Sequence, residues 1–240
     1  MFVWLLATNM PLIMLVLWSA VAAEAPVGRY GQREFAAYFL STLVVRLLTG
    51  AWVVWTMNLE IKNGQLAMRL IRPVHPFWMF AAENVAAWPL RAVMAVPIGV
   101  AAVWMVGGQY FTRDLRQWAL FPIAVLSAWL LNFSIMLVIG CLAFFWQSSF
   151  GAFEVWFRLY IVFSGYVVPV DLFPRVLQDA LRYLPFRYLL AFPVETALGT
   201  ISFTTALHDL ARQWLFISLA LAVAVVLWQR GVRRYEAFGG

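Results

Sequence analysis

Reactive and ionisable side chains are scarce in this sequence. Only 12% of the 240 residues are charged, and the chain holds one cysteine, Cys141, and two histidines, His75 and His208. A single cysteine excludes an intrachain disulfide, and with two distant histidines it forms no recognisable metal-ligand cluster. The same scarcity argues against a hydrolytic triad. We therefore expect no catalytic residue, no metal site and no cofactor bound by this chain.

The signatures of nucleotide and hydrolytic chemistry are also missing. The chain has no Gly-x-x-x-x-Gly-Lys-Ser/Thr phosphate-binding loop, no Gly-x-Ser-x-Gly elbow and no His-Glu-x-x-His zinc pair. Any work that it does against a gradient must therefore draw energy from another polypeptide or from an ion flux.

Apolar residues dominate instead. They make up 64% of the chain, and the mean hydropathy is +0.83. Soluble domains average about 45–50% apolar residues and about 25% charged ones. The net charge of +6 does not indicate nucleic-acid binding, because no basic tract is long enough to neutralise a run of phosphates. Basic residues beside apolar spans are typical of contact with anionic lipid headgroups.

The apolar runs predict one all-α membrane domain over residues 1–240, with six spans. A span needs roughly 20 mainly apolar residues. Ala20-Val21-Ala22 resembles a signal-peptidase site, but no basic residue precedes the long first run, which favours a retained span. Pro89 and Pro97 predict that the third run begins as an interfacial helix and bends into the membrane. The predicted spans are 2–23, 35–57, 77–106, 117–145, 153–170 and 211–228.

The segment after the second span has the sharpest local pattern. At 100° per residue, Gln65, Arg69 and Arg72 fall on one stripe of a helix and apolar residues on the other. Asn63-Gly64 permits a turn before this helix, and Pro73 ends it. The pattern fits a helix resting on headgroups and equally a helix that docks a soluble partner. For the docking alternative, the contact residues are Glu60, Lys62, Gly64, Arg69 and Arg72.

Prolines break the apolar-rich stretch from 171 to 200 into short helical pieces. Broken helices at membrane depth survive only where protein or water shields the backbone. We expect either a re-entrant hairpin that caps a cavity or an ordinary interfacial loop. The residues that mark this segment are Pro174, Pro185, Pro193 and Glu195.

Polar residues inside the spans are few. Arg46 lies near the middle of the second span, where a charge is costly, so we expect it to face the bundle interior or a polar cavity. Glu154 and Arg158 have the acid-first, four-residue spacing of a helical ion pair. Asn132 and Ser134 in the fourth span are candidates for a substrate path, or for hydrogen bonds between helices.

The basic residues divide between the two sides of the membrane. Lys62, Arg69, Arg72 and the cluster at 230–234 fall on one side. Arg29, Arg33, Arg113, Arg116, Arg175, Arg182 and Arg187 fall on the other. Because the cluster at 230–234 directly abuts a span, the positive-inside rule favours two cytoplasmic termini.

The chain resembles permease subunits of ABC-2-type transporters, most closely uncharacterised bacterial export permeases. The matching motifs, in chain order, are Leu59-Glu60-Ile61-x-x-Gly64-x-Leu66-x-x-x-Leu70-x-Arg72-Pro73-x-x-Pro76, Leu184-Pro185-Phe186-Arg187-Tyr188, Phe192-Pro193-Val194-Glu195 and Arg234-Tyr235-x-Ala237-x-Gly239-Gly240.

The resemblance implies an exporter subunit in the bacterial inner membrane, without catalytic residues of its own. Two permeases, identical or homologous, would pair around a substrate path, and separate ABC ATPase subunits would bind ATP and Mg²⁺. The helix from Gly64 to Arg72 would be the cytoplasmic coupling helix, and the segment from 171 to 200 would be the re-entrant helices. The family's amphipathic helix before the first span has no counterpart here, so the start is truncated or that helix is absent.

Two other classes of function remain open at this stage. An ion-coupled carrier would place ionisable residues from several spans at mid-membrane, whereas Arg46 and one ion pair are the clear cases here. A non-transporting membrane scaffold is the second alternative. The cargo is not encoded in any motif of the sequence.

Overall fold

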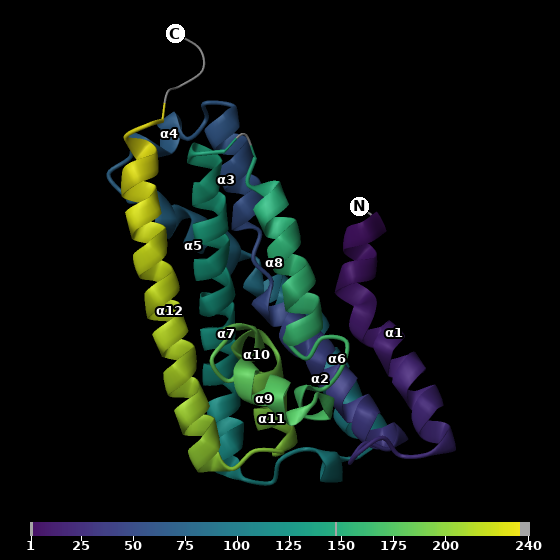
Figure 1. Ribbon diagram of the computed structural model, residues 1–240. Coiled ribbons are helices and arrows are strands. Elements are labelled where there is room, and N and C mark those ends of the chain that lie inside the picture. The colour runs from purple at the N-terminus through teal and green to yellow at the C-terminus, as the bar shows by residue number, and fades with distance from the viewer. Residues whose placement is uncertain (1, 147, 236–240) are drawn as a thin grey trace.

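The computed structural model describes residues 2–146 and 148–235, and all regular elements of this part are helical (Figure 1). The long helices run roughly along one axis, and short helices fill one half of the bundle. The elements are α1 (Phe2–Glu24), α2 (Gln32–Thr49), α3 (Val53–Lys62), α4 (Ala67–Leu70), α5 (Pro76–Ala86), α6 (Trp88–Val106), η1 (Gly108–Tyr110), α7 (Leu115–Cys141), η2 (Leu142–Phe144), α8 (Phe150–Phe163), η3 (Val170–Leu172), α9 (Arg175–Leu181), α10 (Phe186–Leu189), α11 (Ala191–Leu198) and α12 (Phe203–Val232).

Four helical segments are long and apolar enough to cross a membrane, and the expected multi-pass, all-α architecture is confirmed at that level. They are Gln32–Lys62, Pro76–Val106, Leu115–Phe144 and Phe203–Val232. The helix α1 has 23 residues, and the structure describes its side chains from Asn9 to Glu24. The helix α8 has 14 residues, which is about 21 Å against a hydrocarbon core of about 30 Å. Six crossings therefore remain a prediction.

The helix α7 is the centre of the bundle. It packs along α12 over most of its length and also contacts α2, α3 and α11. In the most apolar stretch of the α7 segment 67% of the residues are buried, whereas in that of α12 only 17% are. Leu131 and Leu137 of α7 are fully buried in the same core as Phe39 of α2 and Tyr188 of α10. An apolar helix with one covered face, such as α12, suits a lipid-facing position.

The second predicted span is not one continuous helix, which corrects the expectation for 35–57. The chain leaves helical geometry between α2 and α3, at residues 50–52. Asn132 of α7 donates to the Thr49 carbonyl at 2.9 Å, and Asn84 of α5 accepts from the Trp52 amide at 3.2 Å. A break inside an apolar span needs such partners, because no water is present to satisfy freed backbone groups.

The third span is broken too, as its prolines predicted. The α-helix α5 ends at Ala86, and α6 begins at Trp88. Pro89 lies in the first turn of α6, where the missing N–H carries no intrahelical bond.

The fifth predicted span ends earlier than the sequence suggested, and the sixth begins earlier. The helix α8 stops at Phe163 rather than near 170, and α12 starts at Phe203 rather than near 211. Between them, α9, α10 and α11 fold back against α7, α2 and α8. Phe186 of α10 stacks on Trp156 of α8 with ring centroids 4.7 Å apart. The expected succession of short helical pieces is therefore present and shielded by protein.

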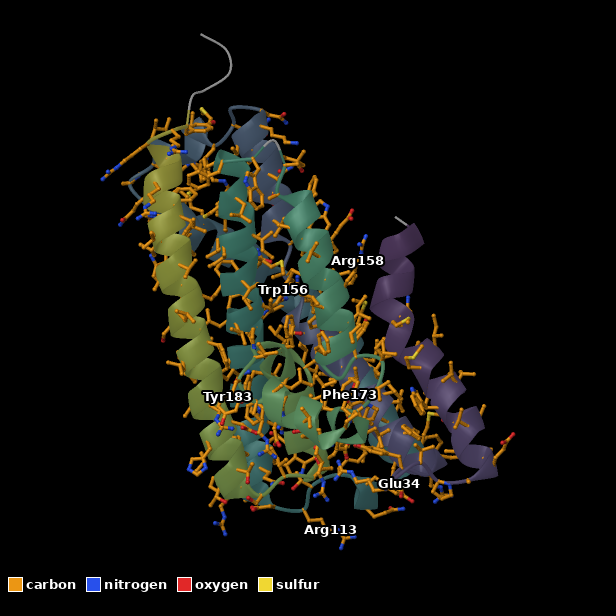
Figure 2. All side chains as sticks on the ribbon, viewed as in Figure 1. Glu34, Arg113, Trp156, Arg158, Phe173 and Tyr183 are labelled. Atoms are coloured by element: carbon orange, nitrogen blue, oxygen red, sulfur yellow. The ribbon has the colours of Figure 1, made fainter. Side chains whose placement is uncertain are left out.

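The two ends of the bundle carry different connections. The α3–α4–α5 connection and the last turn of α12 lie together at one end, at the top of Figure 1. The α1–α2 loop, η1 and the first turn of α12 lie at the other end. The connection that contains Lys62 and Arg72 and the last turn of α12 therefore lie at the end opposite to Arg113, which Figure 2 labels. The charge pattern predicted this separation.

Candidate functional site

The predicted coupling helix is shorter than its sequence pattern suggested. Only Ala67–Leu70 is α-helical, and hydrogen-bonded turns connect this helix to α3 and to the loop that contains Pro73. Gly64 adopts φ +75°, a conformation that favours glycine. The apolar residues of this segment divide between inside and outside, because Leu66 is fully buried whereas Ile71 is exposed.

Arg69 lies in an ion-pair cluster that joins three helices. Its Nε and Nη2 donate to the two carboxylate oxygens of Glu60 at 2.6 Å each, and its Nη1 lies 2.7 Å from Glu83 Oε1. The guanidinium carbon is 4.4 Å from the centre of the Phe80 ring. The hydrogen bonds that Arg69 donates to Glu60, and then to Glu83, raise the pKa of Arg69. Arg69 and Glu60 therefore hold α3, α4 and α5 together, a structural role that the docking hypothesis had not separated from partner contact.

The other residues of this connection point outward. Lys62 and Arg72 are exposed, and so are two large apolar side chains of the α4 turn, Met68 (64%) and Ile71 (76%). Exposed apolar residues with basic neighbours are typical of surfaces that meet lipid headgroups or another protein. Of the predicted contact residues, Lys62 and Arg72 are thus the two whose side chains are free to contact a partner.

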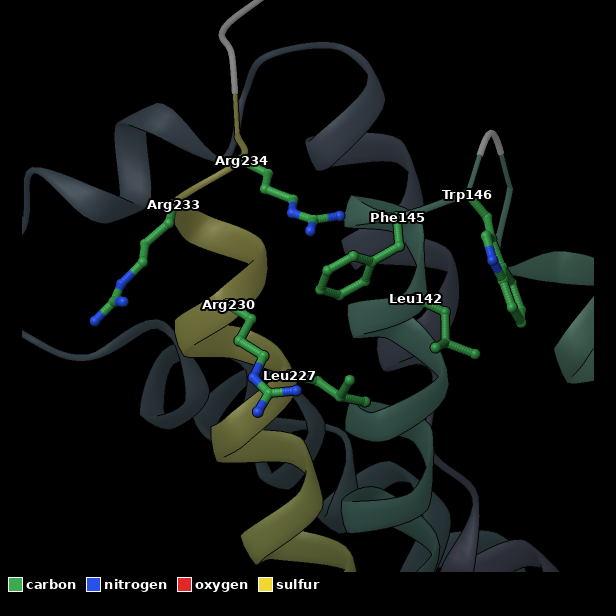
Figure 3. A pocket seen from close by; sticks show the side chains of 7 residues that line it. All are labelled: Leu142, Phe145, Trp146, Leu227, Arg230, Arg233 and Arg234. Carbon is green, nitrogen blue, oxygen red and sulfur yellow. The ribbon is translucent and has the colours of Figure 1, made fainter.

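A hollow of about 540 Å³ lies at the same end of the bundle, between the last turns of α7 and α12 (Figure 3). Leu142, Phe145 and Leu227 form its apolar part. The guanidinium of Arg234 lies 5.4 Å from the centre of the Phe145 ring. The basic lining residues are Arg230, Arg233 and Arg234. Ala237, Gly239 and Gly240, which complete the tail motif, lie outside the described residues.

Arg46 faces the interior, as expected from its depth. It is partly buried, and its guanidinium carbon lies 5.9 Å from the centre of the Tyr160 ring of α8. Its Nε is buried without a hydrogen-bond partner among the described residues. No carboxylate of the described chain pairs with it.

Glu154 and Arg158 form the expected helical ion pair, with 3.3 Å between Arg158 Nη2 and Glu154 Oε2. Both side chains are exposed, 65% and 75%, and Arg158 projects from the outer face of α8 (Figure 2). An exposed pair of this kind contributes about 0–1 kcal/mol to stability.

The two polar candidates of α7 bond to backbone carbonyls. Asn132 caps the end of α2, as described above. Ser134 Oγ donates to the Leu130 carbonyl of its own helix at 2.7 Å and is fully buried. Both contacts are structural, and neither brings a substrate path into view.

The proline-broken segment is fixed to α12 by a buried ion-pair network. Arg187 Nη2 lies 2.5 Å from Glu195 Oε2 and 3.3 Å from Asp209 Oδ2. Burial opposes the charge of Arg187, but Glu195 and Asp209 outweigh it, so the pKa of Arg187 is raised. Pro174 and Pro185 occupy the N-caps of α9 and α10. Pro193 lies in the first turn of α11, where it needs no N–H donor.

Several residues of these clusters were not singled out by the sequence analysis. Asp209 completes the Arg187 network from α12, and Asp171 accepts from Tyr30 at 2.9 Å and pairs with Arg29 at 2.7 Å. These are contacts between distant segments, which periodicity does not reveal. Arg91 of α6 is different, since a charge inside an apolar run is the same signal that identified Arg46.

The comparisons with known proteins identify the family. A family model described as "ABC-2 family transporter protein" matches residues 5–239, nearly the whole chain. No curated protein matches the chain.

Proposed function

The chain belongs to the ABC-2 transporter family, and on that basis we propose that it is the permease subunit of an ATP-driven exporter. The family match over residues 5–239 carries this proposal. Membership makes the chain a membrane component of an ABC transporter. The proposal adds export, a location in the bacterial inner membrane, and a separate ATPase subunit that holds ATP and Mg²⁺.

The proposed ATPase-binding surface is the α3–α4–α5 connection. Its exposed basic residues, Lys62 and Arg72, flank the exposed apolar residues Met68 and Ile71. A patch with an apolar centre and a charged rim is the usual anatomy of a protein interface. Arg69 supports this surface from behind by holding α4 against Glu60 and Glu83.

The positive-inside rule places this end in the cytoplasm. The basic residues closest to span ends, at 230–234 and at Lys62, gather here, together with the last turn of α12. A cytoplasmic position is what an ATPase partner requires. The opposite end, with the α9–α11 segment, then faces outward.

A second permease would complete the substrate path. The outer face of α8 exposes the Glu154–Arg158 pair within a helix that is otherwise rich in apolar residues. Charges in spans usually face a bundle interior or a water-filled cavity rather than lipid. This face therefore supports pairing with an identical or homologous permease, and ATP-driven closure of the partners would switch access between the two sides.

Purification from native membranes tests the subunit assignment. We expect the full-length chain to co-purify with a polypeptide that contains a Gly-x-x-x-x-Gly-Lys-Ser/Thr loop, and the reconstituted complex to hydrolyse ATP. If the purified chain moves cargo with an ion gradient alone, the assignment is wrong.

A charge reversal on the exposed rim tests the coupling surface. The double variant Lys62→Glu/Arg72→Glu should lose the ATPase during purification while the chain stays folded, because neither side chain supports the Arg69 cluster. The matched control is Arg113→Glu/Arg175→Glu, which makes the same change in charge at exposed positions of the other end. Equal retention of the ATPase by both variants would contradict this surface.

A further inference from the structure

Two arginines meet at the centre of the bundle without an acidic partner. Arg46 is one residue from the middle of the segment Gln32–Lys62, and Arg91 is the central residue of Pro76–Val106. A Cβ atom built on Gly50 would lie 3.6 Å from Arg46 Nη1 and 3.8 Å from Arg91 Cζ. The two guanidiniums therefore flank the same point, beside the break between α2 and α3.

The charges of this pair are not neutralised by the described chain. Arg91 is 8% exposed and donates to the Gly50 carbonyl, and neither arginine forms an ion pair among the described residues. Arg46 instead contacts the ring face of Tyr160 and the hydroxyl of Tyr166, and neither of these side chains is a carboxylate. Arginine stays protonated in proteins, so it cannot escape the cost of burial by losing its charge.

Helix ends of both signs border the breaks beside the pair, since α2 ends at Thr49 and α5 at Ala86. The helix α3 starts at Val53 and α6 starts at Trp88, so two helix N-termini border the two breaks. A helix N-terminus carries a partial positive charge, and broken helices in transporters direct such ends at anionic groups near the bilayer midplane. One turn from Arg46 on the same face of α2, the fully buried Thr42 hydroxyl has no hydrogen-bond partner among the described residues.

We propose that Arg46 and Arg91 form an intramembrane oxyanion site that binds the phosphate head of an amphiphile. The two guanidiniums, with the Thr42 hydroxyl one helical turn from Arg46, supply donors of the kind that a phosphate accepts. Access runs past the break, where Gly50 and Ala51 are partly exposed and Trp52 is 39% exposed. This proposal goes beyond the assignment as a permease, because binding can be measured on the chain without its ATPase.

Binding of octyl phosphate to the full-length chain in a neutral detergent tests the site. Occupancy is followed by native mass spectrometry, and the rise in Tm with ligand concentration gives the affinity. We expect Arg46→Gln to weaken octyl phosphate binding at least tenfold and Arg46→Lys to weaken it less. The control Arg158→Gln removes an exposed arginine of α8 and should leave the affinity unchanged.

Arg46 is the main variant because, unlike Arg91, it donates no hydrogen bond to the described backbone of the break, so its substitution is not expected to unfold the chain. Arg91 supports the break by its bond to Gly50, so Arg91→Gln is interpretable only if its Tm without ligand matches the wild-type value. Two further probes, inorganic phosphate and octyltrimethylammonium, test the source of the phosphate and the sign of the ligand's charge. Octyl phosphate binding without inorganic phosphate binding supports an amphiphile, and binding of both supports the same site with a soluble oxyanion as ligand.

Two results would overturn the proposal. The first is equal affinity of wild type and Arg46→Gln for octyl phosphate, or equal binding of octyltrimethylammonium, which carries the opposite charge. The second is a carboxylate from a second permease found against both guanidiniums in the assembled transporter. Failure on either ground leaves ATPase association untouched, since that depends on Lys62 and Arg72 at the end of the bundle.

Discussion

Arg187 and Arg46 show two opposite ways of holding a guanidinium inside this protein. Arg187 is 10% exposed and contacts two carboxylates, Glu195 and Asp209, while Arg46 is partly buried and has none. Among the residues that the structure describes, Glu195 and Asp209 bind Arg187, Glu60 and Glu83 bind Arg69, and no carboxylate pairs with Arg46 or Arg91. The ion pairs of Arg187 stabilise the fold of the α9–α11 segment against α12. The charge of Arg46 has no carboxylate partner in the described chain and is therefore available to a ligand.

The largest expected effect comes from opening the Arg187 network. Arg187→Ala leaves Glu195 and Asp209 buried without a cation, which typically costs about 3–5 kcal/mol. Burial already raises the pKa of Glu195, and Arg187 is the group that opposes this shift. We expect most of the protein to be lost from the monodisperse fraction in detergent size-exclusion chromatography. A Tm within two or three degrees of wild type, roughly the effect of 1 kcal/mol in a chain of this size, would contradict the assignment of this network as structural.

For Arg46, at the centre of the bundle, the comparison predicts that a substitution raises stability instead of lowering it. Replacing Arg46 by Met removes a charge that lacks a counter-ion, and an arginine at a helix centre costs about 2.5–3.5 kcal/mol on insertion scales. Arg46→Met should therefore raise Tm in the absence of an anionic ligand. The measurement is thermal unfolding in neutral detergent, with Leu47→Met as a volume-matched apolar control. A fall in Tm would mean that Arg46 has a compensating partner within the chain.

A third change tests the turn that presents the proposed ATPase surface. Gly64 has φ +75°, and a non-glycine residue in left-handed geometry costs about 1–2 kcal/mol. Gly64→Ala should lower Tm by a few degrees and weaken ATPase retention, because α4 shifts with the turn. Gly151→Ala is the control, since a Cβ there meets no other atom within 4 Å. Unchanged retention in Gly64→Ala would show that the turn does not set the surface.

The smallest effect is expected at the exposed ion pair of α8. Glu154→Gln/Arg158→Gln removes both charges at once, and exposed pairs contribute about 0–1 kcal/mol. Tm of the isolated chain should stay within one or two degrees of wild type. If pairing with a second permease covers this face, the same variant should shift the dimer–monomer balance in crosslinking experiments.

Much of the architecture followed from composition and periodicity alone. The apolar runs located every long helix, and Pro89 foretold the break between α5 and α6. The break at Gly50–Trp52 could not be foreseen, because it depends on Asn132 and Asn84, which come from helices far away in the sequence. The same limit applies to the ends of α8 and α12, where packing against the α9–α11 segment decides the helix length.

The sites divide in a similar way. A charge inside an apolar run identified Arg46. The same rule applies to Arg91, whose guanidinium lies beside the same glycine, Gly50, in the structure. The stripe of Gln65, Arg69 and Arg72 predicted an exposed basic face, and one of its members, Arg69, turned out to bind two acids instead. Periodicity describes which residues share a face and carries no information on which of them find partners three helices away.

The two interruptions, at Gly50–Trp52 and at Ala87, divide two spans at nearly the same height. On the far side of these breaks lie α3 and α5. Arg69 of α4 forms ion pairs with both helices, so that the three short helices form a single block. This block is not isolated from the bundle, because α3 packs against α7 and Phe77 of α5 contacts Trp228 of α12. A force applied to the α4 turn would therefore reach the central helix and the last span directly.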